Sequence, residues 1–342
     1  MAAKEGDDGP VAPRRPDPAH GQRDAALPGV PDVSKDKPRN LAASVRHRLA
    51  DLARKQGEDF QLVLTRYVIE RFLYRLSHSP YRHEFILKGA MLFRVWTDQI
   101  HRPTRDLDLL SRGAPSLDAL THVFCDICML AVEDDGLTFD PATVTAERIK
   151  EDQEYEGVRV GCRAQLGQAR IDLQIDVGFG DAVVPRPASV TYPTMLEFEA
   201  PRVRAYPRET VVAEKFQAMV MLDIANSRMK DFFDLWTLAN TFEFDGASLC
   251  RAIRATFNRR KTNLPTAPSL ALTAEFGTDA AKVRQWEAFV RKAKLDTGGI
   301  TLEQVCAYLH GFLVPPTEAL VAKTAFEKTW PPAGPWRGTE PS

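Results

Sequence analysis

Two aspartates one residue apart, Asp106 and Asp108, are the residues of this chain whose type and spacing most directly suggest chemistry. In an extended strand, residues two apart point to the same face, so both carboxylates would leave one side of a strand whose other side is apolar. Two like charges held this close are costly unless a cation lies between them. The pair therefore indicates a metal site, although a solvated turn with two surface aspartates would have the same local sequence.

The residues that precede the aspartates predict a phosphate-binding turn. Lys88, Gly89 and Ala90 follow the apolar pair Ile86 and Leu87, and a helical pattern of apolar residues comes next. Backbone N–H groups in such a turn before a helix can bind phosphate oxygens. A turn, a helix and then a strand that ends in Asp-x-Asp would place a phosphate cradle beside a Mg²⁺ site.

A third carboxylate is predicted on a later strand. Two alternating runs, VRVGCRAQLG and ARIDLQIDVGFGD, are joined through Gly167-Gln168 and predict an antiparallel hairpin. In the second run Asp172, Gln174 and Asp176 share one face by alternation. Asp176 is favoured as the third metal ligand because it is closer to the end of the strand, while Asp172 lies deeper. Both could also face solvent on an exposed sheet surface.

The composition limits the class of protein. The 342 residues suit two structural units, and 45 basic against 46 acidic residues leave a net charge of −1, so any contact with nucleic acid would depend on local patches. The cysteines are scattered, which fits a reducing cytoplasm, and Cys125-x-x-Cys128 is interpreted as a buried helix face rather than a zinc site. Without a long apolar run or a signal core, we expect a soluble, cytoplasmic protein with no membrane contact.

The pattern along the chain predicts an α/β core followed by helices. Helical periodicity covers residues 40–78 and resumes at Ser116, and after a Pro-rich stretch the sequence is again mostly helical. The boundaries expected are residues 1–37 for a disordered segment, 38–200 for the core, 201–318 for a helical domain and 319–342 for a loose tail.

Two clusters of charge lie in the helical half. In ETVVAEKFQAMV, Lys215 lies beside a buried stripe, and in NSRMKDFFDLWTLAN, Asp231 and Asp234 share a face with basic residues nearby. On their own these patterns are equally those of a solvated helix surface with local ion pairs.

Taken in order, LKGAML, RPTRDLDLL, LQIDVGFGD, YPRETVVAEKFQAMV and NSRMKDFFDLWTL resemble the AbiEii/AbiGii nucleotidyltransferase toxin family over residues 84–240. The resemblance implies an α+β fold, with a polymerase-β-like nucleotidyltransferase core of a small mixed sheet and helices, followed by a helical C-terminal domain. It also implies Mg²⁺ as cofactor and a type IV toxin–antitoxin or phage-defence role with a cognate antitoxin.

By the resemblance, Asp106, Asp108 and Asp176 are the metal ligands. Lys215 matches the lysine of Ala-Glu-Lys and should approach the nucleotide phosphates. Asp231 matches the first aspartate of Arg-Asp-x-x-Asp and would orient or deprotonate the acceptor hydroxyl.

The remaining nucleotide contacts come from the two loops before the metal pair. Lys88 and Gly89 match the phosphate-side turn, and Arg102 and Thr104 match the Arg-x-Ser/Thr that precedes the aspartates. Ala90-Met91 departs from the family pattern of Gly-Thr and lacks a hydroxyl, so phosphate binding would depend on backbone N–H groups. In the later motif, Met229-Lys230 stands where an arginine often precedes the first aspartate.

The implied reaction moves a nucleoside monophosphate from an NTP to an acceptor hydroxyl, with RNA, and the tRNA 3′ end first, as the expected acceptor. Candidate RNA contacts are Arg202, Arg204, Arg208, Arg259, Arg260 and Lys261, which could equally be solvated charges. Two alternatives stay open from the sequence. The same site could transfer a γ-phosphate to a protein or small molecule, or the core could be a non-enzymatic nucleotide-sensing or interaction module.

Overall fold

The computed structural model describes residues 40–338, apart from 98–100, 114–115 and 153–154. Residues from 39 onward form one compact unit. The segment predicted to be disordered, residues 1–37, lies outside the described residues.

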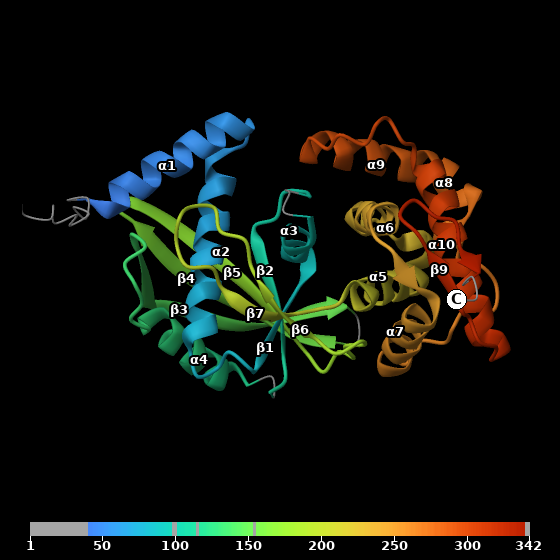
Figure 1. The fold of residues 1–342 in the computed structure, drawn as a ribbon, viewed down its shortest axis with the longest axis horizontal. Coiled ribbons are helices and arrows are strands. Elements are labelled where there is room, and N and C mark those ends of the chain that lie inside the picture. Colours follow the sequence, from blue (N-terminus) through green and yellow to red (C-terminus); the bar gives the residue numbers. More distant parts are fainter. Residues whose placement is uncertain (1–39, 98–100, 114–115, 153–154, 339–342) are drawn as a thin grey trace, which may run out of the picture. The chain divides into compact units, whose positions relative to one another are not determined.

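The first part of the chain combines helices and strands (Figure 1). In chain order its elements are α1 (Leu41–Gln56), α2 (Phe60–His78), β1 (Phe85–Lys88), the 3₁₀ helix η1 (Gly89–Met91), α3 (Leu92–Thr97), β2 (Asp106–Ser111), α4 (Leu117–Met129), β3 (Leu137–Asp152), β4 (Tyr155–Leu166), β5 (Ala169–Phe179), β6 (Ala188–Thr191) and β7 (Arg202–Ala205). The predicted hairpin through Gly167-Gln168 joins β4 and β5. Ser116 caps α4, as expected, by accepting a hydrogen bond from the N–H of Ala119.

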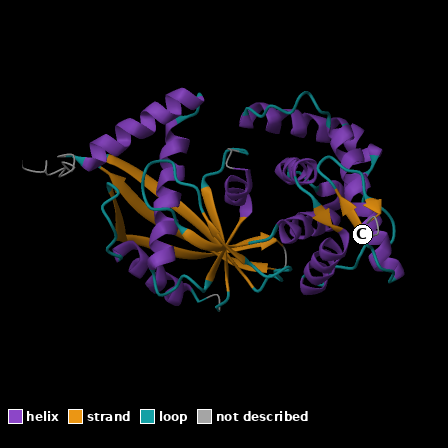
Figure 2. Cartoon of the chain, viewed as in Figure 1, coloured by secondary structure: helices purple, strands orange, loops and turns teal. Residues whose placement is uncertain are grey.

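The second part is mainly helical, as the sequence predicts (Figure 2). Its elements are α5 (Arg208–Leu222), η2 (Asp223–Ala225), α6 (Met229–Thr241), β8 (Phe244–Asp245), α7 (Gly246–Arg259), η3 (Leu270–Leu272), α8 (Ala274–Thr278), α9 (Ala280–Ala293), α10 (Leu302–Ala322), β9 (Lys328–Trp330) and β10 (Arg337–Gly338). A mixed sheet followed by helices is the predicted fold class.

Within the described residues, seven strands form one mixed sheet in the order β3-β4-β5-β2-β1-β7-β6. In its centre, β2 is parallel to β5 on one side and antiparallel to β1 on the other, and β1 is parallel to β7. The strands that carry the predicted carboxylates are therefore neighbours.

Alternation along β2 and β5 gives the sheet one apolar and one polar face. Leu107 and Leu109 are buried, whereas Asp106 and Asp108 are half-buried on the other face. One prediction differs from the structure, because β2 begins rather than ends at the Asp-x-Asp pair. The apolar residues after the pair continue the strand to Ser111 by pairing with β1.

Helices α1, α2 and α4 pack against the apolar face (Figure 1). A cluster of three aromatic rings joins the helices to the sheet. Phe72 of α2 stacks on Phe124 of α4 and contacts Phe139 of β3 edge-on. Burial of this face leaves the carboxylates on the opposite face of the sheet.

The core of α2 also contains buried charges. Arg71 and Arg75 bind the carboxylate of Asp135 at 3.0 and 2.7 Å. Glu70 is fully buried and accepts a hydrogen bond of 2.7 Å from the N–H of Met195. Burial raises the pKa of Glu70 to about 7, against the opposing effect of that hydrogen bond and of Arg71.

Among the described residues, α10 is long and apolar enough to cross a membrane by length and composition, but 56% of that span is buried inside the protein. Leu309, Phe312 and Leu313 on this helix are fully buried. In this fold α10 is a core helix of the helical half.

The C-terminal segment differs from the loose tail expected over 319–342, of which the last four residues lie outside the described part. Helix α10 continues to Ala322, and β8, β9 and β10 form a small antiparallel sheet. The indole N–H of Trp330 donates to the carbonyl of Ala239 at 2.7 Å, and that of Trp336 to the carbonyl of Phe312 at 3.0 Å. The segment is held against distant helices by Trp330, which is buried, and by Trp336, which is half-buried.

Candidate active site

Three strands bring three residues of the predicted site together on the polar face of the sheet. Asp108 is the register partner of Asp176 on β5 and of Lys88 on β1, so all three lie side by side. Residues directly opposite in neighbouring strands point to the same face. The preference for Asp176 over Asp172 fits this register, although Asp176 lies within β5 rather than at its end. Asp172 is exposed and pairs with Arg163 at 2.8 Å.

Gly89 is packed directly against Asp108. Its φ is +75°, and a Cβ built there would lie 1.9 Å from Oδ2 of Asp108. Only glycine combines this backbone conformation with so close an approach. The glycine of the predicted turn therefore makes room for the carboxylate of Asp108.

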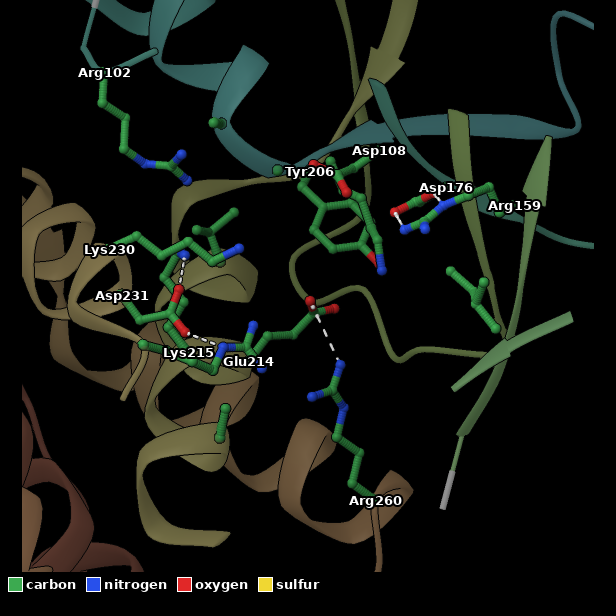
Figure 3. Close-up of a pocket in the computed structure, with 17 residues that line it drawn as sticks. Arg102, Asp108, Arg159, Asp176, Tyr206, Glu214, Lys215, Lys230, Asp231 and Arg260 are labelled. Carbon is green, nitrogen blue, oxygen red and sulfur yellow. Dashed lines mark hydrogen bonds and ion pairs between the residues drawn. The ribbon is translucent and has the colours of Figure 1, made fainter. Parts of the chain in front are cut away.

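A cavity of about 540 Å³ opens in front of these residues, between the sheet and helices α5 and α6; we call it the central cavity (Figure 3). Its carboxylates are Asp108, Asp176, Glu214 and Asp231, and its basic residues are Lys88, Arg102, Arg159, Lys215, Arg228, Lys230 and Arg260. Seven basic side chains and four carboxylates line this cavity, and two further carboxylates, Asp181 and Asp234, pair with basic residues of the lining, so one formal positive charge remains in excess. Such a lining favours a polyanionic ligand.

Asp106, the other half of the predicted metal pair, lines an adjoining cavity of about 400 Å³. The pKa of Asp106 is raised, first by burial and then by the negative charge of Asp176. The two carboxylates therefore repel each other across the strands.

Arg159 separates the two cavities, since its side chain lines both. It binds Asp176 through two hydrogen bonds of 2.9 Å, and Figure 3 shows the two side chains facing each other. Such a bidentate pair neutralises one of the carboxylates. Arg159 thus holds the place beside Asp176 that a cation would otherwise take.

The aspartates fit Mg²⁺ by donor chemistry, because carboxylate oxygens are the ligands that this ion prefers. The repulsion between Asp106 and Asp176 is the kind that a bound cation relieves. Among the described residues, however, no group of three acidic, histidine or cysteine side chains is already arranged around one point. Metal binding would require Arg159 to leave Asp176.

Lys215 lies at the centre of a buried charge cluster on α5 and α6. Its Nζ is 2.5 Å from Asp231 and 2.9 Å from Asp234. Arg102 binds Asp234 through two hydrogen bonds of 2.8 and 3.0 Å, and Arg228 lies 2.8 Å from Asp231. Asp234, which the sequence places on the same helix face as Asp231, is therefore an equal partner in the cluster.

The electrostatics of this cluster favour its charged form. Burial opposes ionisation of Asp234, but Arg102 and Lys215 outweigh it and hold the pKa of this carboxyl well below its usual range. Burial likewise opposes ionisation of Asp231, whose pKa is lowered by Lys215 and Arg228. The pKa of Lys215 is raised, because its two aspartates outweigh the effect of burial. The lysine is thus a fixed cation at the cavity wall.

Of the other predicted nucleotide contacts, three line the central cavity and one does not. Lys88, Gly89 and Arg102 line the central cavity. Thr104 does not, and its hydroxyl lies 3.4 Å from the carbonyl of Asp106. Arg102 lines the cavity, but its guanidinium group also donates two hydrogen bonds to Asp234. It therefore helps to hold the aspartate that pairs with Lys215.

The predicted RNA contacts are divided. Arg260 lines the central cavity, where it donates to Asp181 at 3.2 Å and to Gln217 at 2.9 Å. Those outside this cavity are Arg202, Arg204, Arg208, Arg259 and Lys261. Arg208 lies over the ring of Phe242, with its guanidinium carbon 4.4 Å from the ring centre.

Arg159 was not among the predicted site residues, although the sequence contains a signal for it. A two-residue turn at Gly167-Gln168 pairs Leu166 with Ala169, and counting back along both strands pairs Arg159 with Asp176. No comparable local pattern identifies Tyr206, which follows β7. Its side chain is buried and lines the central cavity beside Glu214, and the pKa of its phenol is raised, first by burial and then by the charge of Glu214.

Paired aspartates on adjacent strands of a mixed sheet open onto a cavity rich in basic residues beside a helical half, which is the arrangement expected from the resemblance to a nucleotidyltransferase. The sequence profile of the family described as nucleotidyl transferase AbiEii toxin, type IV TA system, matches residues 71–308. The chain belongs to this family of nucleotidyltransferase toxins.

Two solved structures from Helicobacter pylori are similar to the chain. One is the crystal structure of JHP933, with 16% identity, a TM-score of 0.45 and coverage of 78% of this chain and 95% of that one. The other is a proposed nucleotidyltransferase, with 16% identity, a TM-score of 0.42 and coverage of 78% and 100%. No curated protein matches the chain.

Proposed function

We propose that this toxin transfers a nucleoside monophosphate from an NTP to the 3′-hydroxyl of an RNA, in a reaction that requires Mg²⁺. The observation that carries the proposal is the register pair of Asp108 and Asp176 facing a cavity with excess positive charge. In the reaction, the acceptor hydroxyl gives its proton to water and its oxygen forms a bond to the α-phosphorus, while the bond from this phosphorus to the oxygen that bridges it to the β-phosphorus breaks. Pyrophosphate leaves with the electron pair.

The residues of the sheet would hold the reacting groups. Asp106, Asp108 and Asp176 would bind Mg²⁺, which stabilises charge on both the attacking and the leaving oxygen. Lys88 and the backbone at Gly89 would face the phosphates, in keeping with their place beside Asp108. Alignment of the acceptor with the α-phosphorus on this rigid face lowers the entropic part of the barrier.

The helical half would supply a fixed positive charge. Lys215 is suited to the leaving pyrophosphate, because two buried aspartates hold its ammonium group in one place. Asp231 is fully buried, and its lowered pKa makes it a weak base. We therefore assign Asp231 to the positioning of Lys215 rather than to deprotonation of the acceptor.

The test is transfer of radioactive label from NTPs to total cellular RNA by the full chain in the presence of Mg²⁺. Wild type and Asp172→Ala should label RNA from α-labelled NTP, whereas Asp108→Ala should not. Asp172 is the matched control, since it lies on the same face of β5 but is exposed and outside the central cavity. Equal labelling by Asp108→Ala would refute the assigned site.

The same experiment separates the alternatives. Transfer of the γ-label to an acceptor would indicate a phosphotransferase, and binding of NTP without transfer of either label would indicate a sensing module. The size of the labelled RNA tests the tRNA 3′ end as acceptor. We further propose that the toxin acts in the cytoplasm in phage defence and is restrained by a cognate antitoxin, as membership of a type IV toxin family suggests.

A further inference from the structure

A second cavity on the same face of the sheet is lined by three arginines. It has a volume of about 570 Å³, and Arg112, Arg186 and Arg204 surround a floor that includes Ile86 and Leu110. We call it the arginine cavity. Ile86 and Leu110 are register partners, one step along the same face from the partners Lys88 and Asp108. The arginine cavity therefore continues the polar face that carries the catalytic carboxylates.

The positive charge of this cavity is not balanced from within. The carboxylate in its lining is Asp181, which lies 3.6 Å from Lys88 and 3.2 Å from Arg260. Both of those basic residues belong to the central cavity. Asp181 is thus committed to the neighbouring site.

The three arginines make no ion pair with any carboxylate in the described part of the chain. Arg204 donates instead to the carbonyl of His83 at 3.2 Å. The pKa of Arg204 is lowered, first by burial and then by the charge of Arg112. Like charges that approach each other without compensation favour an external anion.

Arginine is suited to one class of anion in particular. The planar guanidinium binds phosphate oxygens through two parallel hydrogen bonds, and clusters of arginine are typical of phosphate-backbone recognition. A concave site with an apolar floor can hold a phosphate together with the sugar attached to it.

The two cavities share a wall. Gly180 and Asp181 line the arginine cavity, and Arg259, the last residue of α7, and the next residue, Arg260, donate hydrogen bonds to the Gly180 carbonyl and the Asp181 carboxylate. Along the chain, Arg112 follows Asp108 by four residues, which is about 13 Å in an extended strand. A strand whose 3′ end lies at Asp108 would need support at such a distance.

We propose that the arginine cavity binds the phosphodiester backbone of the acceptor RNA a short distance upstream of its 3′ end. This inference rests on the proposed function. In it the RNA reaches Asp108 from the side of the arginine cavity, and the NTP occupies the central cavity. The attraction has to be local, because the net charge of the chain is −1.

The test measures equilibrium binding of a fluorescent single-stranded RNA of ten nucleotides with a free 3′-hydroxyl, in the absence of NTP, at several salt concentrations. The variant Arg112→Gln plus Arg186→Gln should bind this RNA about tenfold more weakly. The slope of log affinity against log salt should fall by about 1.4, because each lost contact to a single strand removes about 0.7. The variant Arg284→Gln plus Arg291→Gln, which removes two exposed charges from α9, should behave as wild type.

The other arms decide what binds there. A fluorescent NTP, in the absence of RNA, should bind equally to wild type and to both variants. If only the Arg112 and Arg186 variant lost NTP binding, the arginine cavity would be a second nucleotide site and the proposal would be overturned. The proposal also fails if the RNA affinity and salt slope of that variant match those of the α9 control. It fails equally if the cavity variant loses binding only to a fluorescent polyglutamate peptide, which would indicate a protein partner. The binding assay needs no reaction. If the protein binds RNA through this cavity but transfers no nucleotide, the proposed function is refuted and the proposed RNA site is not.

Discussion

Replacing Gly89 with alanine tests whether the position of Asp108 controls the reaction. Residue 89 has φ +75°, and an alanine Cβ would lie 1.9 Å from the Oδ2 of Asp108. An unstrained contact is about 3.5 Å. The carboxylate would therefore have to retreat by about 1.5 Å, or the turn would have to move by a similar amount.

Two separate costs follow from this geometry. An alanine in the left-handed region costs about 1–2 kcal/mol of folding free energy. Displacement of a catalytic group by about 1 Å costs on the order of 10²-fold in rate, which corresponds to about 2.7 kcal/mol of transition-state stabilisation. We expect Gly89→Ala to fold and to lose at least about 10²-fold in kcat/KM.

The matched control is Gly57→Ala. Gly57 has φ +65° at the end of α1, and a Cβ built there meets nothing within 4 Å. This variant should lose a similar amount of stability in urea unfolding while keeping its activity. If Gly89→Ala were as active as Gly57→Ala in the labelling assay, Asp108 would not act from the position described.

Two further predictions concern buried and paired carboxylates. The pKa of Glu70, raised to about 7, means that the folded protein holds a proton that the unfolded chain releases near pH 4.5, so stability should fall by about 3 kcal/mol as the pH rises from 4.5 to 7. Glu70→Gln should remove this fall in urea unfolding at pH 5 and 8, and an unchanged difference between the two pH values would contradict the assignment. Arg159→Met should free Asp176 and tighten Mn²⁺ binding about fivefold, since a half-exposed pair contributes about 1 kcal/mol. Electron paramagnetic resonance of free Mn²⁺ measures this affinity, and weaker binding would show that Arg159 does not compete with the metal.

Local periodicity was sufficient to predict the polar face of the sheet. Alternation in DLDLL and RIDLQIDV places the carboxylates on one side, and the turn of two residues between β4 and β5 even determines the partner of Asp176. The sequence also indicates the helices of the second half by their apolar spacing. These features depend on residues that are close in the chain.

Contacts between distant residues were not predictable in this way. Arg102 and Asp234 are 132 positions apart, and nothing in either segment specifies the other. The Pro- and Gly-rich C-terminal segment has the composition of a loose tail, yet its Trp330 is buried in the helical half. The composition of a segment does not show whether one of its side chains will be buried elsewhere. Here the burial and hydrogen bond of a single indole hold the segment in place.

The bond between Trp330 and Ala239 has a consequence for how the protein is made. Helix α6 holds Asp231 and Asp234, but the residue that anchors its far end is 91 positions later. At a synthesis rate of about 5–20 residues per second, α6 waits roughly 5–20 s on the ribosome before its anchor exists. During that interval the nascent chain carries Asp231 and Asp234, the two carboxylates that hold Lys215, on a helix that lacks this bond. Completion of the charge cluster around Lys215 is thereby delayed until late in translation.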